Sequence, residues 1–197
     1  MLQFLTHKST RYLAAEQARM ALEGGCTWIQ VTASMNDGES MKEIVEQLQP
    51  ICEEKEAFLI VDTDVELCNE TRIHGVHLHK GDMAPEVARE TLGAHAVIGC
   101  DVESADDIMA LQGKDIDYAA IQLTSCDAEE LAQLSEMIAN AREKGSEMPI
   151  VARGQFSNEN LNALLSVGVN GFAISTQITE SENPTECISS ILIELEK

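Results

Sequence analysis

Short apolar segments alternate with longer amphipathic segments along the whole chain. The apolar segments are rich in Val and Ile and mostly apolar at consecutive positions, which is typical of parallel strands covered on both faces. The strands expected from this pattern are Leu2–His7, Thr27–Ala33, Phe58–Asp62, Gly75–His79, Ala96–Asp101, Asp117–Thr124, Pro149–Gly154 and Gly171–Ile178.

Apolar residues at helical spacing fill the segments between these strands. The helices expected are Tyr12–Glu23, Ser40–Glu53, Val65–Arg72, Ala84–Thr91, Ser104–Leu111, Ala128–Glu143, Asn158–Val167 and Pro184–Glu196. The third of these is the weakest, because it is short and polar.

Strands that alternate with helices predict a parallel sheet with right-handed crossovers. A closed barrel is favoured over an open sheet, because eight strands are expected and no glycine-rich dinucleotide loop follows the first one. No linker or low-complexity segment divides the 197 residues. The prediction is therefore an α/β protein, a single-domain (β/α)8 TIM barrel over residues 1–197, near the lower size limit of roughly 200 residues for this fold.

The net charge of the chain excludes some classes of binding partner. Lys and Arg number 13 against 34 Asp and Glu, for a formal net charge of −21. Such a chain repels nucleic acid and anionic membrane surfaces, so neither is expected as a partner. Most of the acidity is interpreted as a solvated surface, which leaves small phosphorylated substrates open as ligands.

The cysteines and the N-terminus indicate a cytoplasmic protein. The six cysteines form no C-x-x-C pair, and several lie within apolar segments, as small core residues do. We expect reduced thiols. The N-terminal residues do not form a signal-peptide pattern, and no apolar run is long enough to span a membrane. The sequence leaves self-association into a homo-oligomer open.

In barrels of this kind the active site lies at the C-terminal ends of the strands. The last two expected strands lead there to Arg153, Gly154 and Gln155, and to Ser175 and Thr176. Loops after the seventh and eighth strands often bind phosphate through backbone N–H groups, and an arginine can add a bidentate contact. The alternative is that Gly154 only begins a turn and Arg153 only offsets nearby acids.

The stretch GVHLHKGD contains a second group of candidates. His77 and His79 are two residues apart on a strand and so face the same side. Such a pair can bind a transition metal, but the spacing indicates no third ligand, so a structural or substrate-contacting role is favoured. Lys80 follows as a possible substrate contact. Asp82 suits Mg²⁺ beside a substrate phosphate, or simply begins the next helix.

The same stretch resembles the thiamine phosphate synthase family, which includes thiazole tautomerases. That family has a GVHL strand end followed by an aspartate and a proline-containing helix start, as in GVHLHKGDMAPEVARETLGAHAVIGC. EGGCTWIQV is similar to the family's second strand, which ends in a glutamine, here Gln30. MPIVARGQFSNENLNALLSVGVNGFAIST is similar to its last two units. The resemblance covers essentially the whole chain.

The resemblance implies thiamine biosynthesis by a transferase of the (β/α)8 fold. The family joins hydroxymethylpyrimidine pyrophosphate to thiazole phosphate and releases pyrophosphate with the help of Mg²⁺. It implies Gln30 as a catalytic residue, Asp62 and Asp82 as ligands of Mg²⁺, and the backbone around Gly154 and Thr176 as the thiazole phosphate site.

Several family positions differ in this chain. Thr32 and Ser34 occupy positions where the family has basic residues, and Asp62-Thr63 replaces an Asn-Asp pair. Asp64 stands where an arginine is common, and residues 123–127 replace a Thr-Pro-Thr-Lys stretch. These differences remove positive charge from the place where a pyrophosphate needs it, and each lost charge-assisted contact costs about 1.5–3 kcal/mol.

Two other functions are therefore open. A thiazole tautomerase needs the thiazole phosphate site and an acid–base group but no pyrophosphate pocket. Glu103 lies near the position of that group and can move protons, although it is also an ordinary acid of a first helical turn. The other possibility is a non-catalytic barrel that binds a phosphorylated ligand. Fold analogy does not decide among the three.

Overall fold

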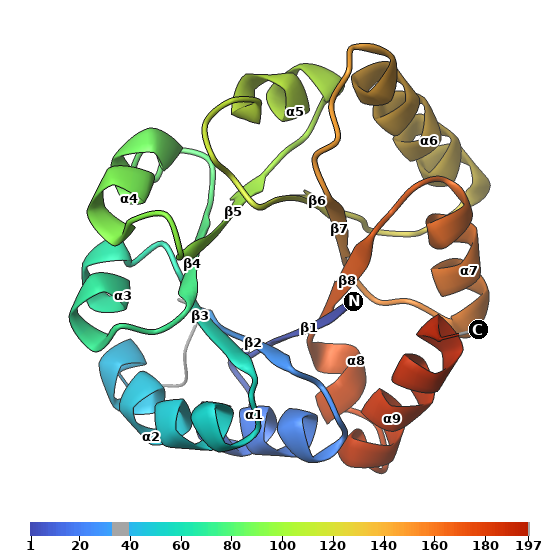
Figure 1. Cartoon of the computed structure of the whole chain (residues 1–197). Coiled ribbons are helices and arrows are strands. Elements are labelled where there is room, and N and C mark those ends of the chain that lie inside the picture. The colour runs from blue at the N-terminus through green and yellow to red at the C-terminus, as the bar shows by residue number, and fades with distance from the viewer. Residues whose placement is uncertain (33–39, 197) are drawn as a thin grey trace.

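A computed structural model describes residues 1–32 and 40–196. Within them, eight parallel strands pair in chain order and close into a barrel, with the last strand beside the first. The strands are β1 (Leu2–Leu5), β2 (Trp28–Val31), β3 (Phe58–Asp62), β4 (Gly75–Leu78), β5 (Val97–Asp101), β6 (Tyr118–Gln122), β7 (Ile150–Arg153) and β8 (Gly171–Ile174). Figure 1 looks along the barrel and shows the helices as an outer ring.

The helices cover the outer face of the barrel. They are α1 (Ala14–Glu23), α2 (Met41–Glu54), α3 (Val65–Thr71), α4 (Pro85–Leu92), α5 (Ala105–Leu111), α6 (Ala128–Glu143), α7 (Asn158–Ser166), α8 (Thr176–Thr179) and α9 (Pro184–Leu195). The predicted (β/α)8 TIM barrel is confirmed. The weakest predicted helix is present as α3, and it begins where the Asp64 carboxylate accepts a hydrogen bond of 2.8 Å from the Leu67 N–H.

The predicted end of the last strand is wrong. The strand stops at Ile174, and the short helix α8 follows at Thr176–Thr179. Ile178 is buried on a helical turn, and its apolar side chain extends the apolar pattern of the strand in the sequence. The predicted end of the second strand, at Ala33, lies outside the described residues.

Two layers of buried side chains hold the barrel together. Outward-facing residues such as Ile29, Val61 and Val76 belong to the large core between strands and helices. A smaller cluster inside the barrel contains Trp28 and Ile60. Because side chains alternate along a strand, the residues two positions further on also point inward, nearer the C-terminal ends. These positions are polar, and they form the site described below.

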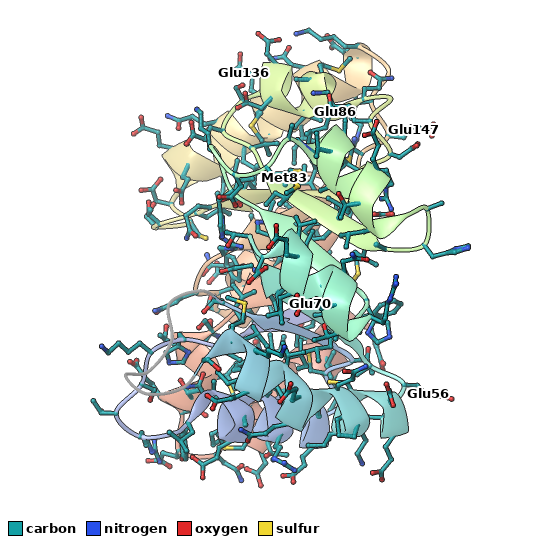
Figure 2. The ribbon with its side chains drawn as sticks, turned by 90° about the vertical axis from the view of Figure 1, so that its left-hand side faces the viewer. Glu56, Glu70, Met83, Glu86, Glu136 and Glu147 are labelled. Atoms are coloured by element: carbon teal, nitrogen blue, oxygen red, sulfur yellow. The ribbon has the colours of Figure 1, made fainter. Side chains whose placement is uncertain are left out.

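The acidic residues of the helices lie mainly on the outer surface. Figure 2 labels Glu70 of α3, Glu86 of α4 and Glu136 of α6, and all three side chains are exposed to solvent. This arrangement agrees with a solvated acidic surface. No helix in the described part of the chain is long and apolar enough to cross a membrane.

Candidate active site at the barrel mouth

A closed ring of hydrogen-bonded side chains fills the C-terminal mouth of the barrel. Gln3 of β1 donates through Nε2 to the Gln30 side-chain oxygen at 2.7 Å and to the Tyr118 hydroxyl at 3.3 Å. Gln30 of β2 in turn donates to the Asp62 carboxylate of β3. Gln3 and Gln30 are fully buried, so these partners satisfy amides that would otherwise be costly to bury.

The two predicted histidines complete the ring. His79 lies with its Nε2 3.4 Å from Asp62 and its Nδ1 2.6 Å from Asp101. The other Asp101 oxygen is 2.8 Å from Nε2 of His77, whose Nδ1 is 3.0 Å from the Tyr118 hydroxyl. Seven side chains therefore form one continuous network, six of them on strands β1 to β6 and His79 directly after β4, and its last link returns to Gln3.

The two histidines are held in different protonation states. Burial lowers the pKa of His77, which favours a neutral ring. Hydrogen bonds to Asp101 and then Asp62 raise the pKa of His79 to about 10, which favours a cation. Burial alone would raise the pKa of Asp101, but hydrogen bonds from both histidines outweigh it and keep the carboxyl ionised. Asp101 therefore only accepts, so the neutral His77 is protonated on Nε2 and accepts from Tyr118 on Nδ1.

A glycine makes room for the tyrosine of the ring. Gly99 on β5 pairs with His77 on one side and with Tyr118 on the other. A Cβ at Gly99 would lie 2.0 Å from the Tyr118 ring. Position 99 therefore has to lack a side chain for the Tyr118 hydroxyl to reach His77.

Arg153 lies on the same side of the mouth as His79 and Asp101, which we call the charged side. Its guanidinium is 3.7 Å from Asp101, and its side chain is only 18% exposed. Its Nε is buried without a hydrogen-bond partner in the described structure. In this structure the arginine predicted as a phosphate contact thus points at a carboxylate of the ring.

Gly154 begins the loop after β7, where its N–H donates to the Ala173 carbonyl at 3.2 Å. A Cβ here would lie 3.0 Å from the Phe156 ring and 3.1 Å from the Leu123 carbonyl. The structure therefore needs glycine for close packing, and this N–H serves the sheet.

The remaining residues predicted for phosphate lie together on the other side of the mouth. Gln155 donates through Nε2 to the Thr176 hydroxyl at 2.9 Å. The Ser175 hydroxyl is 2.8 Å from Nδ1 of His7, and Nε2 of His7 is 3.1 Å from the Thr179 hydroxyl. Burial lowers the pKa of His7, so this group is neutral.

Three more predicted site residues line a pocket of about 280 Å³ between β4 and α5. Lys80 and Glu103 form an ion pair of 3.0 Å at its exposed rim. The Asp82 carboxylate accepts a hydrogen bond of 2.8 Å from the His79 backbone N–H. His79 and Asp101 also line this pocket, so the ring and the Asp82 loop face the same space.

At positions that differ from the family, Thr32 and the loop after β6 form hydrogen bonds within the protein. Thr32 donates through its hydroxyl to the Thr6 carbonyl at 2.7 Å. After β6, one Glu130 carboxylate accepts from the backbone N–H groups of Thr124, Ser125 and Cys126. That loop therefore directs its N–H groups at a carboxylate of the protein itself. Ser34 lies outside the described residues.

The sequence pattern did not identify Gln3 and Tyr118 as site residues, and it predicted no partner for Asp101. A polar residue at an inward-facing position of a strand is the signal that could have identified such site residues. Gln3 is such a residue within the first apolar segment. Asp101 ends β5, beside the strand that carries His77, and the pairing of neighbouring strands predicts its contact with both histidines.

The closed barrel and its mouth of carboxylates, imidazoles and amides define a small TIM-barrel enzyme with its site at the C-terminal ends of the strands. Residues 2–178 match the model of the thiamine monophosphate synthase family. The chain belongs to this family.

Individual relatives agree over nearly the full length. The chain is 36% identical to the thiamine-phosphate synthase of Bacteroides thetaiotaomicron, covering 97% of this chain and 95% of the relative. It is also 36% identical to the one of Bacteroides fragilis, with coverages of 97% and 98%. The solved structure of a thiamine phosphate pyrophosphorylase from Pyrococcus furiosus superposes with a TM-score of 0.82 at 25% identity, covering 99% of this chain and 95% of that one. The expected family and its transferase class are confirmed.

Proposed function

We propose that this protein joins hydroxymethylpyrimidine pyrophosphate to thiazole phosphate, with release of pyrophosphate, as a step of thiamine biosynthesis in the cytoplasm. The observation that carries the proposal is similarity to named thiamine-phosphate synthases over 97% of the chain. The six free cysteines, five of them buried, suit a reducing compartment.

The charged side of the mouth supports pyrophosphate release. In the proposed reaction the bond from the pyrimidine methylene to pyrophosphate breaks, and its electron pair leaves on the pyrophosphate. This step needs cations placed where the negative charge develops. His79 and Lys80 border the same pocket as Asp82, and Arg153 lies beside Asp101. We assign these three cations the task of the basic residues that Thr32 and Ser34 replace.

Asp82 is the proposed contact to Mg²⁺. One of its oxygens accepts from the His79 N–H, and a carboxylate of this kind holds Mg²⁺ together with substrate phosphates. Both oxygens of Asp62 already have partners, Gln30 and His79, so Asp62 binds the ion only if His79 moves away. When bound, Mg²⁺ would neutralise charge on the leaving pyrophosphate.

The other proposed roles follow from position. Gln30 is buried and acts as a positioning residue, because its amide orients Asp62. Gln155, Ser175 and Thr176 would receive the thiazole phosphate on the neutral side of the mouth. Glu103 stays with Lys80 at the rim and would move protons only for a substrate bound there.

The test is formation of thiamine phosphate by the purified protein from both substrates with Mg²⁺. We expect product that requires each component and falls by about 10–100-fold in Asp82→Asn, the equivalent of one lost charge-assisted contact. Asp106→Asn is the matched control, because this aspartate is 87% exposed and contacts only Lys144 in the described structure. No product from the wild type would contradict the proposal.

One observation favours a second candidate, isomerisation of a thiazole phosphate. The ring places a charged imidazole and a neutral one on the same carboxylate, an arrangement that can give and take protons without a pyrophosphate site. Proton exchange into a thiazole phosphate, in the absence of the pyrimidine substrate, would support this candidate. Binding of the thiazole phosphate with neither reaction would instead indicate a non-catalytic binder.

A further inference from the structure

Three ligand-type side chains converge where β4 and β5 end. His77, His79 and Asp101 each offer one atom, and these atoms lie within 4.8 Å of one another. Within the described residues this is the only such group of three or more His, Cys, Asp or Glu side chains. The spacing of the two histidines indicated no third ligand, and the neighbouring strand supplies one.

We propose that His77, His79 and Asp101 form a binding site for a divalent transition-metal ion of the zinc type. His77 would bind through Nε2, His79 through Nδ1 and Asp101 through its carboxylate. Both nitrogens now point at Asp101, at 2.8 and 2.6 Å. Ligand atoms around a tetrahedral zinc ion lie about 3.3–3.5 Å apart, given metal–nitrogen bonds of about 2.0–2.1 Å. Each nitrogen therefore has to move about 0.5–0.9 Å further from the Asp101 carboxylate to admit the ion.

The second nitrogen of each histidine already lies beside a polar group that can accept from it. For His77 this requires the proton to move to Nδ1, so the Tyr118 hydroxyl changes from donor to acceptor when the ion occupies Nε2. Asp62 lies 3.4 Å from Nε2 of His79, and the Tyr118 hydroxyl lies 3.0 Å from Nδ1 of His77. Metal-binding histidines usually have a carboxylate or another polar group on the far nitrogen, which fixes the ring and its tautomer. Here both rings are oriented before any ion arrives, and Gln30 fixes Asp62 in turn.

The ligand set selects the class of metal. Two imidazoles with one carboxylate suit zinc and similar first-row ions, whereas Mg²⁺ and Ca²⁺ prefer oxygen ligands alone. Three protein ligands leave a coordination position open, as in catalytic rather than structural zinc sites. His79 and Asp101 line the same pocket as Lys80 and Asp82, so two of the three ligands border a space that can hold a ligand.

The local charge indicates what that ligand is. Arg153 brings a positive charge to within 3.7 Å of Asp101. A bound divalent ion would add two positive charges at the same place. The open position therefore suits a small anion such as phosphate or a carboxylate.

This site is separate from the proposed Mg²⁺ contact at Asp82, which lies outside the group of three. It shares His79 with the residues proposed for pyrophosphate release, where a bound ion would take over the positive charge of the imidazolium. Metal binding is nevertheless measured without either substrate, so the two tests are distinct. Failure of one proposal leaves the other standing.

Titration of chelator-treated protein with Co²⁺ and with Zn²⁺ tests the proposal. We expect one equivalent of each to bind and Co²⁺ to give the visible absorption of a site with low coordination number. His79→Gln and Asp101→Asn should lose this absorption, because each removes a ligand. Tyr118→Phe keeps all three ligands and should bind about 10–100-fold more weakly.

His95→Gln is the matched control, because His95 is exposed and precedes β5 at the opposite end of the barrel. It should bind both metals as the wild type does. X-ray absorption of the zinc-loaded wild type makes the test independent of variant folding, and it should detect two imidazole ligands. Equal binding by wild type and His79→Gln, no binding by the wild type, or a zinc shell without imidazole would each overturn the proposal.

Discussion

The two sides of the barrel mouth use different chemistry. On the β3–β5 side, a charged His79 lies between Asp62 and the ionised Asp101, and Arg153 approaches from β7. On the β7–β8 side, Ser175 and Thr176 meet neutral partners, His7 and Gln155. Removing one partner of a buried charged pair lowers the free energy of unfolding strongly, because the other charge is left buried without a partner. Each neutral hydrogen bond contributes only about 1 kcal/mol. Substitutions should therefore act mainly on stability and charge on one side and on ligand affinity on the other.

The largest effect on stability is expected from filling the space that the Tyr118 ring occupies beside Gly99. Gly99→Ala places a methyl group 2.0 Å from the Tyr118 ring inside the barrel, where neither backbone nor ring has room to move. We expect the free energy of unfolding to fall by about 3 kcal/mol, at the upper end for overpacked cores. Chemical denaturation measures this loss.

Gly113→Ala is the control for that substitution. Its Cβ would meet nothing within 4 Å, and only its φ of 79° opposes a side chain. This change should cost about 1 kcal/mol. Equal losses in the two variants would show that the Tyr118 contact does not constrain position 99.

The next largest effect on stability is expected from removing the negative charge of Asp101. Asp101→Asn keeps the shape of the side chain but leaves His79 and Arg153 without their shared carboxylate. We expect a loss of about 1.5–3 kcal/mol in the free energy of unfolding. Asp106→Asn, which breaks only an exposed pair with Lys144, should change it by less than about 1 kcal/mol. A loss no larger in Asp101→Asn than in this control would mean that the ring is not a charged network.

The pH dependence of stability separates the two histidines of the ring. The pKa of His79 is raised from 6.5 to about 10 on folding, so its stabilisation is complete below pH 6.5 and is lost as the pH rises toward 10. The pKa of His77 is lowered, so its contribution is lost instead as the pH falls below 6.5.

Unfolding of the metal-free protein between pH 5 and 10 measures both effects. His79→Gln should flatten the alkaline decline and leave the acidic one unchanged. Nitrogen NMR of the imidazoles at pH 8 should find both nitrogens of His79 protonated. A neutral His79 at that pH would refute the assigned protonation states.

The smallest effect on stability is expected on the neutral side. Gln155→Ala removes one exposed hydrogen bond to Thr176 and should change the free energy of unfolding by less than about 0.5 kcal/mol. If this side receives the thiazole phosphate, its affinity should nevertheless fall several-fold by calorimetry. Unchanged affinity would remove Gln155 from the proposed phosphate site.

The barrel was predictable from sequence because its strands are apolar at consecutive positions and its helices have a clear apolar face. The boundary after β8 was not, because Ile178 is buried on a helical turn and continues the apolar pattern. The ring was only partly predictable. His77 and His79 were found from their spacing, whereas their contacts with Asp101 and Tyr118 depend on which strands are neighbours and on the space left by Gly99.

The positions of the cations at the mouth could not be predicted from the sequence pattern either. The replacement of basic residues by Thr32 and Ser34 indicated a loss of positive charge. Only the structure brings Arg153 and a protonated His79 to the same carboxylate. The family resemblance therefore identified the family correctly, whereas the cations proposed to replace the missing ones depend on the three-dimensional arrangement.

In the proposed function, the charged side of the mouth supplies the cations for synthase chemistry. The most direct measurement compares the rate of thiamine phosphate formation by the wild type and by His79→Gln, with Mg²⁺ and both substrates at saturation. We expect product from the wild type and a rate at least about tenfold lower in the variant, because one charge-assisted contact is lost. Equal rates, or no product from the wild type, would contradict it.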